Sequence, residues 1–215
     1  NPEVIVDAIR IYREREQQAQ ADQAKMALSA HKDSLINDPN APVAGNPKGD
    51  VTVVEFFDYH CGYCKRVFPV LRELLDSDKN LRWVFKEFPI LGPEAVTASR
   101  AALSAWKLDP AKYLAFHAAL MATSGGLPED RILKIAKTAG YDADKLKKEM
   151  ASDSVTAEIN RNHQIAETLG LHRRRRTGAR RGRCRHPAPT DRQGTQGLTP
   201  PRLAAGRTLS AVGFR

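Results

Sequence analysis

Cysteine is scarce in this chain: 215 residues contain three, at positions 61, 64 and 184. So few cysteines exclude the multi-disulfide framework of small secreted proteins. A structural zinc site normally needs a second Cys or His pair, and the sequence has neither a second CxxC nor an HxxxH motif. The remaining candidates for chemistry are Cys61 and Cys64, with a pair of buried structural cysteines as the alternative. Cys184 is interpreted as incidental.

Long apolar runs are also missing. No stretch of 18 or more apolar residues occurs, so no membrane-spanning helix is predicted, and no signal-peptide pattern is visible. Acidic residues are nearly absent from position 172 onward, where the sequence contains twelve arginines and one acid, Asp191. Residues 1–171 carry 22 basic and 24 acidic residues, a net charge of −2, so the chain's +9 comes from its tail. We therefore expect no nucleic-acid partner for the main domain.

The CxxC motif lies between a strand pattern and a helix pattern. Val51–Phe57 is a nearly continuous apolar run, typical of a buried strand. After Cys64, apolar residues recur at helical spacing, at Val67, Phe68, Leu71, Leu74 and Leu75. A strand, a CxxC and a helix in this order indicate a thioredoxin-type redox site.

The predicted helix start gives the two cysteines different roles. Unpaired backbone N–H groups and the positive end of the helix dipole stabilise a thiolate, so the pKa of Cys61 should fall. Cys61 is then the attacking thiol, and Cys64 resolves the mixed disulfide. This chemistry needs no cofactor beyond the redox-active Cys61–Cys64 disulfide, and no metal.

Two further residues are candidates for the site. Glu55 stands in the apolar strand, where a carboxylate is costly unless it is paired or functional, and it could relay the proton that Cys64 must lose. A solvent-facing position for Glu55 is the alternative. His60 adjoins Cys61, and as an imidazolium it could stabilise the thiolate; a solvated loop residue is the alternative. Lys86, on the next predicted strand, either approaches Glu55 or faces solvent.

The residues Glu55-Phe-Phe-Asp-Tyr-His-Cys-Gly-Tyr-Cys-Lys-Arg66 resemble the DsbA-like family of periplasmic thiol-disulfide oxidoreductases. The resemblance runs from about residue 1 to 171. It is nearest to the subgroup with an N-terminal helical extension, which includes ScsC and Com1-type proteins. It implies an α/β thioredoxin-like fold with an inserted helical domain and an N-terminal helical stalk. The Gly-Tyr dipeptide between the cysteines is similar to that of the disulfide isomerase DsbC.

Pattern and resemblance together divide the chain into five segments. The expected segments are a helical stalk (1–37), a linker rich in Pro and Gly (38–50), a thioredoxin-like part with the CxxC (51–92), an inserted helical domain (93–171) and a basic tail of low order (172–215). The stalk has no core of its own, so we expect it to self-associate; a helix folded back on its own domain is the alternative. His117 and His163 are expected to be structural or surface residues.

The tail departs from the family pattern at His172. Related proteins continue with a Gly-x-Pro loop whose cis-proline faces the CxxC, then two strands and a helix, so the C-terminal strands of the fold are expected to be missing or replaced here. A frameshift is one explanation, since shifted codons could encode such a loop. The alternatives are a disordered basic tail that binds anionic surfaces or RNA, and a truncated product without function.

The sequence thus predicts a periplasmic thiol-disulfide oxidoreductase, whose leader was removed or is absent from this chain. Its partners would be exported proteins with thiols or disulfides, a membrane redox partner of the envelope, and other copies of itself through residues 1–37. The alternative function is a non-enzymatic envelope protein that binds Cu(I) through Cys61, Cys64 and His60. The sequence leaves open whether the pair acts as oxidase, isomerase or reductase.

Overall fold

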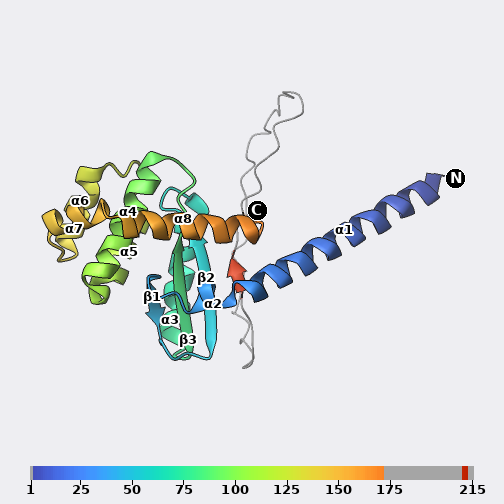
Figure 1. Ribbon diagram of the computed structural model, residues 1–215, viewed down its shortest axis with the longest axis horizontal. Helices are drawn as coiled ribbons and strands as arrows, with labels where there is room; N and C mark the ends of the chain where they lie inside the picture. Colours follow the sequence, from blue (N-terminus) through green and yellow to red (C-terminus); the bar gives the residue numbers. More distant parts are fainter. Residues whose placement is uncertain (1, 172–209, 213–215) are drawn as a thin grey trace, which may run out of the picture.

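The computed structural model describes residues 2–171 and 210–212. A small twisted sheet lies at the centre of the molecule, with helices on both of its faces (Figure 1). A lobe of four helices stands beside the sheet, and one long helix projects away from both. This arrangement confirms the predicted α/β thioredoxin-like fold with a helical insertion and an N-terminal helical extension.

The sheet has the strand order β1-β3-β2-β4. Its strands are β1 (Val43–Gly45), β2 (Val51–Phe57), β3 (Leu81–Glu87) and β4 (Ser210–Val212). β2 and β3 are parallel, because α3 (Gly62–Ser77) returns the chain to the starting edge of the sheet between them. β1 pairs antiparallel with β3, and β4 pairs parallel with β2.

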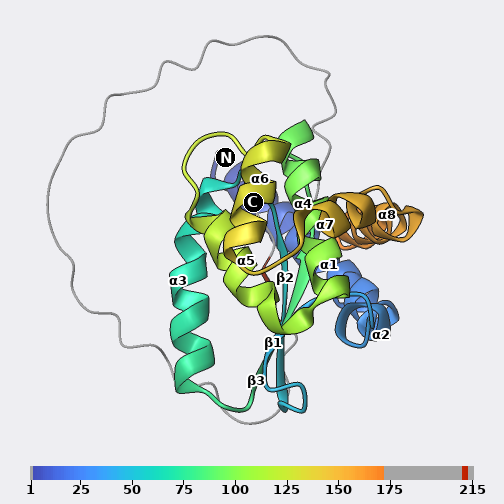
Figure 2. The ribbon, with the colours of Figure 1, turned by 90° about the vertical axis from the view of Figure 1, so that its left-hand side faces the viewer.

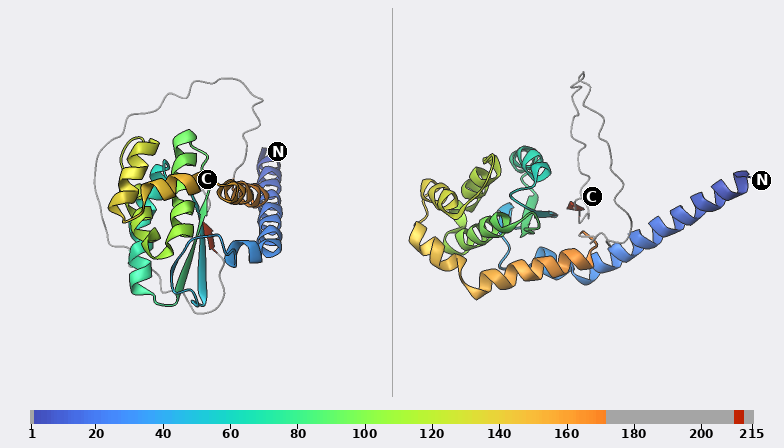
Figure 3. Two further views of the ribbon diagram at one scale, coloured as in Figure 1. Left: turned by 60° about the vertical axis from the view of Figure 1, so that its left-hand side comes forward. Right: turned by 90° about the horizontal axis from the view of Figure 1, so that it is seen from above.

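The two faces of the sheet carry different layers (Figures 2 and 3). α3 covers one face, here called the front, while α2 (Lys32–Ile36) and α8 (Asp153–Thr168) cover the other, the rear. Side chains alternate along a strand, so Phe85 of β3 joins the front core and Val84 joins the rear core. The same alternation decides where the charged side chains of β2 and β3 lie.

The helical lobe consists of α4 (Pro93–Leu108), α5 (Pro110–Ala122), α6 (Glu129–Thr138) and α7 (Ala143–Met150). Carboxylate caps define two of its helix starts: Asp109 accepts from Ala111 N–H, and Asp142 accepts from two N–H groups of the first turn of α7. α8 then leaves the lobe and runs back across the sheet. The predicted helical segment 93–171 therefore also supplies part of the rear core.

The N-terminal segment differs from the prediction at its boundaries. α1 (Pro2–Ala30) has no buried residue and extends away from the domain (Figure 1). The stalk ends there, however, because α2 within the predicted range 1–37 packs on the rear face through the fully buried Leu35. The joint lies at His31, between the two helices.

The expected linker, 38–50, is corrected as well. Strand β1 falls inside this range, and Ala41 and Ala44 are buried against the sheet. Gly45 ends β1 with φ +80°, and a Cβ there would stand 2.3 Å from the carbonyl oxygen of Leu81. The glycine is thus required by a close backbone approach rather than by flexibility. Composition alone could not distinguish these two reasons.

The tail contributes one described element. The three residues of β4 lie along β2, with Val53 opposite Ser210 and Glu55 opposite Val212. The edge of β2 is therefore occupied there, although the sequence led us to expect the C-terminal strands of the fold to be missing or replaced. The predictions of a frameshift, of an incidental Cys184 and of a missing cis-proline loop concern residues outside the described part of the chain.

Candidate active site

The two cysteines lie where the sequence predicts them, at the start of α3. Cys61 is the N-cap residue, and its Sγ lies 3.5 Å from the backbone nitrogen of Cys64, which donates to it. Cys61 is partly exposed, whereas Cys64 is 1% exposed, and both are free thiols. A reagent from solution therefore meets Cys61 first.

Cys64 is set into the molecule beneath Cys61. Burial raises the pKa of its thiol, and the negative charges of Cys61 and Glu55 act in the same direction. The opposing contribution comes from the backbone N–H of Asp58, which donates to Cys64 Sγ at 3.5 Å. Cys64 therefore needs a nearby base and a hydrogen-bond donor before it can act as a thiolate.

Glu55 is a buried acid on the front face of the sheet, 5% exposed. Its Oε2 accepts a hydrogen bond of 3.0 Å from the indole N–H of Trp83. Burial raises the pKa of Glu55 to about 7, and the Trp83 bond limits the rise. The alternative of a solvent-facing Glu55 is therefore wrong, and the acid lies close enough to influence Cys64.

The ring of His60 faces Glu94 of the helical lobe. Its backbone N–H donates to Asp58 Oδ1 at 2.7 Å, and its ring Nε2 lies 3.6 Å from Glu94 Oε2. The same carboxylate oxygen of Glu94 accepts the N–H of Leu127 at 2.7 Å. His60 thus ties the active-site turn to the helical lobe, and its predicted support of the Cys61 thiolate stays a prediction.

A family model described as a DSBA-like thioredoxin domain matches residues 52–172, more than half of the chain. The chain belongs to the DsbA-like thioredoxin family. The match begins on the β2 strand and includes the CxxC, α3 and the whole helical lobe.

Two solved structures agree with membership of the DsbA-like family. A thioredoxin-like oxidoreductase from Silicibacter pomeroyi DSS-3 is 51% identical, with a TM-score of 0.61, over 64% of this chain and 79% of the other. A linker-deletion variant of ScsC from Proteus mirabilis is 28% identical, with a TM-score of 0.71, over 79% of this chain and 78% of the other.

One curated relative is much longer than this chain. A Na(+)/H(+) antiporter, NhaA 1, of Salinispora arenicola is 33% identical over 111 residues, which are 51% of this chain and 17% of the antiporter. The chain thus spans less than a fifth of that relative's length. Among residues 2–171 and 210–212, no helix of this DsbA-like protein has the length and apolar character needed to cross a bilayer.

Lys86 shows where the sequence interpretation of this DsbA-like site fails. It is fully buried, so the solvent-facing alternative is wrong, and it does not meet Glu55 either. In the parallel register Lys86 lies opposite Phe56, whereas Glu55 lies opposite Phe85. Lys86 therefore points to the rear face, where its Nζ bonds Asp38 Oδ2 and lies 3.7 Å from Glu158 Oε1.

A buried polar group beneath the site went unpredicted. Glu87 is fully buried at the end of β3 and accepts hydrogen bonds from Ser99 Oγ at 2.7 Å and from Tyr59 OH at 3.3 Å. Tyr59 OH also lies 2.8 Å from Nδ1 of His117. Burial raises the pKa of Glu87 well above its usual range, and the hydrogen bonds from Ser99 and Tyr59 oppose this rise. The rule that singled out Glu55, an acid in an apolar strand, could have found Glu87 too.

The two histidines of the helical segment are both in aromatic surroundings. His117 is fully buried, with its ring 5.0 Å from that of Phe57, and burial lowers its pKa to about 3. His117 is therefore a neutral core residue, as one of the two expected interpretations held. The ring of His163 lies 4.8 Å from that of Phe88 on the rear side.

Proposed function

We propose that this protein is a thiol-disulfide oxidoreductase that acts on the disulfides of exported proteins in the periplasm. The observation that carries the proposal is the pair itself: a partly exposed Cys61 at a helix N-terminus and a buried Cys64 in the first turn of the same helix. The buried acid Glu55 lies close enough to raise the pKa of Cys64. A thioredoxin-like oxidoreductase that is 51% identical to this chain supports the proposal.

The proposed reaction has two exchange steps. The Cys61 thiolate attacks a substrate disulfide, forming a Cys61–substrate disulfide and releasing one substrate thiolate. Cys64 then loses its proton to Glu55 and attacks Cys61 Sγ, which forms the Cys61–Cys64 disulfide and releases the second substrate thiolate. The substrate gains two electrons and two protons, the second of them by way of Glu55, and the protein dithiol loses them. The reverse sequence oxidises a substrate dithiol.

Reduction of insulin in the presence of dithiothreitol and a Cu(I) chelator tests this function. Activity that survives the chelator supports the oxidoreductase, since the exchange needs no metal. An inactive protein that binds Cu(I) tightly at the same thiols would favour the copper-binding alternative. An inactive protein that neither binds copper nor melts cooperatively would point to a product without function.

The direction of exchange is the finer part of the proposal. The Gly62-Tyr63 dipeptide, similar to that of DsbC, favours an isomerase, which works in the reduced form. Equilibration with glutathione gives the reduction potential. A reduction potential of about −120 mV is typical of a strong dithiol oxidant, and much lower potentials are typical of a reductase. A membrane redox partner in the envelope would keep the pair in its working state.

Glu55→Gln is expected to slow exchange while stabilising the fold. The folded-state pKa of about 7 lies above the usual 4.5, so Glu55 favours folding below about pH 4.5, and this contribution is lost as pH rises through 7. Glutamine cannot ionise, so the variant avoids the free-energy cost of a buried carboxylate at high pH. It should be more stable than the wild type by on the order of 2–3 kcal/mol at pH 8. Loss of the base should slow the Cys64 step by roughly 100-fold and remove the rise of its rate through pH 7.

Stopped-flow kinetics between pH 5.5 and 8.5 and denaturant unfolding measure the two effects. The exposed Glu73→Gln on α3 is the control for removing a carboxylate. A Glu55→Gln protein with an unchanged pH profile would contradict the relay.

We also propose that copies of the chain associate through α1. The first three turns of this helix expose a group of apolar side chains, namely Val4, Ile5, Val6, Ile9, Ile11 and Tyr12. An exposed apolar surface on a helix that projects away from its domain is typical of an interaction site.

Deleting residues 1–30 is expected to convert the assembly to monomers without loss of the domain. The deletion stops before α2, because Leu35 and Asp38 belong to the rear core. Sedimentation equilibrium measures the mass. Ile9→Glu should act like the deletion, whereas Gln18→Glu, in the polar middle of α1, should not. An unchanged mass after deletion would refute the association.

A further inference from the structure

Asp58 is the first residue after strand β2, at the start of the turn that leads to the CxxC. It is 2% exposed, and neither the sequence pattern nor the proposed reaction gives it a role. Its carboxylate pairs with no cation among the residues the structure describes. It accepts three backbone hydrogen bonds instead: Oδ1 from His60 N–H at 2.7 Å, and Oδ2 from Ile90 N–H at 2.8 Å and Leu91 N–H at 2.9 Å.

These three bonds hold two loops together beside the cysteines. One loop is the active-site turn 58–61, and the other is the segment that follows β3, which carries the partly exposed side chains of Ile90 and Leu91. The turn closes on itself too, since Cys61 N–H donates to the carbonyl of Asp58 at 3.0 Å. The peptide that carries the Asp58 N–H is held as well, because its carbonyl, that of Phe57, accepts from Phe88 N–H at 2.9 Å. The carboxylate, the carbonyl and the preceding peptide of Asp58 together set the orientation of its backbone.

That orientation matters because the backbone N–H of Asp58 points at Cys64 Sγ, 3.5 Å away. A thiolate at Cys64 would be 1% exposed, among mostly apolar side chains of the front core and near the buried acid Glu55. Without a donor, a buried anion of this kind is strongly disfavoured. The Asp58 N–H lowers the pKa of Cys64 against the effect of burial, so it favours the charged form.

We propose that Asp58 is a positioning residue for the resolving step, whose carboxylate locks the active-site turn so that its own N–H stabilises the Cys64 thiolate. The inference deepens the proposed function and rests on it. Asp58 touches no substrate. It acts through the backbone, at the moment when Cys64 has given up its proton and attacks Cys61 Sγ.

Asp58→Asn tests the role at constant size. An amide has one acceptor oxygen, so its NH₂ group must face either the N–H of His60 or the N–H groups of Ile90 and Leu91. The variant therefore loses at least one of the three backbone hydrogen bonds. Reduced protein is mixed with oxidised glutathione, quenched with acid at intervals, and analysed by mass spectrometry for the Cys61–glutathione disulfide. We expect attack by Cys61 to change less than about twofold and resolution by Cys64 to slow about tenfold or more, so that the mixed disulfide accumulates.

The matched control is Asp142→Asn, which alters a carboxylate that also accepts backbone N–H groups, at the start of α7, far from the cysteines in the fold. It should leave both steps unchanged. Equal slowing of both steps in Asp58→Asn would mean a general loss of structure. An unchanged rate of resolution by Cys64 would mean that Asp58 has no role in that step. Either result overturns the inference. An inactive wild-type protein would instead count against the proposed function itself.

A second measurement needs no variant and decides the matter if Asp58→Asn does not fold. In the amide NMR spectrum of the reduced wild type, the Asp58 proton resonance should move downfield as Cys64 ionises, and its titration midpoint should match that of the Cys64 Cβ resonance in the same samples. An Asp58 amide that does not follow this titration would overturn the proposal.

Discussion

Cys61→Ser is expected to abolish disulfide exchange, whereas Cys64→Ser should stop the reaction halfway. In the proposed reaction the partly exposed thiol of Cys61 makes the first attack, and a serine hydroxyl does not ionise at neutral pH, so the rate should fall by roughly 100-fold or more. In Cys64→Ser, the first step still forms a bond between Cys61 and the substrate. The second thiol is absent, so the mixed disulfide should persist.

Non-reducing gels and mass spectrometry of the trapped adducts measure this asymmetry. Cys184→Ser is the control, because the sequence interpretation makes that cysteine incidental. It should behave as wild type in both steps. If Cys61→Ser trapped substrate and Cys64→Ser did not, the assigned order of attack would be reversed. Equal residual activity in the two variants would mean that the different burial of Cys61 and Cys64 does not decide which thiol attacks first.

The sequence could predict the redox pair because its signal is local. A buried strand, two cysteines two residues apart and an amphipathic helix occupy residues 51–77, and the position of Cys61 at the helix start follows from chain order alone. Glu55 was accessible to the same reasoning, since an acid in an apolar strand needs an explanation. Its surroundings were not, because the Trp83 N–H that meets it lies 28 residues away.

The groups that were missed depend on register and on distant partners. Asp58 comes directly after a strand, where an acid is typical of a solvated loop, and its bonds to residues 90 and 91 exist only once β2 and β3 lie side by side. Both interpretations of Lys86, near Glu55 or facing solvent, are wrong, because the sequence alone does not reveal the register of neighbouring strands. A shift of one residue moves a side chain from one face to the other.

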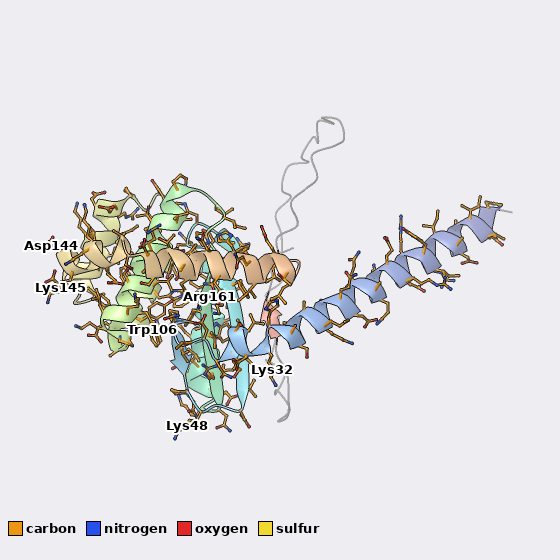
Figure 4. The ribbon with its side chains drawn as sticks, in the orientation of Figure 1. Lys32, Lys48, Trp106, Asp144, Lys145 and Arg161 are labelled. Atoms are coloured by element: carbon orange, nitrogen blue, oxygen red, sulfur yellow. The ribbon has the colours of Figure 1, made fainter. Side chains whose placement is uncertain are left out.

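The consequence of that register is a charged cluster in the rear core. Lys86, from β3, meets Asp38, which follows α2, and Glu158 on α8. Arg161, labelled on α8 in Figure 4, completes the cluster through its ion pair with Glu158. Three segments far apart in the sequence thus share one buried cation. The cluster joins the base of the N-terminal extension and the returning helix to the sheet that carries the cysteines.

Lys86→Met is therefore expected to destabilise the domain by about 3–5 kcal/mol, because it leaves two buried carboxylates without their central cation. For a domain of this size the loss corresponds to a fall in Tm of roughly 10 °C. Lys134→Met is the control: its ion pair with Asp130 is exposed on α6 and should contribute less than about 1 kcal/mol. Denaturant unfolding monitored by circular dichroism measures both variants.

The pH dependence separates a lost charge from lost packing. Burial raises the pKa of Glu158 to about 7 even with Lys86 present, so its contribution favours folding below about pH 4.5 and is lost as pH rises through 7. Without the lysine this penalty grows, and the deficit of Lys86→Met should be larger at pH 8 than at pH 5. Adding Glu158→Gln should recover part of it. A loss of stability that is independent of pH and is not relieved by Glu158→Gln would contradict this account. It would mean that the methionine side chain packs poorly and that the charges of the cluster contribute little.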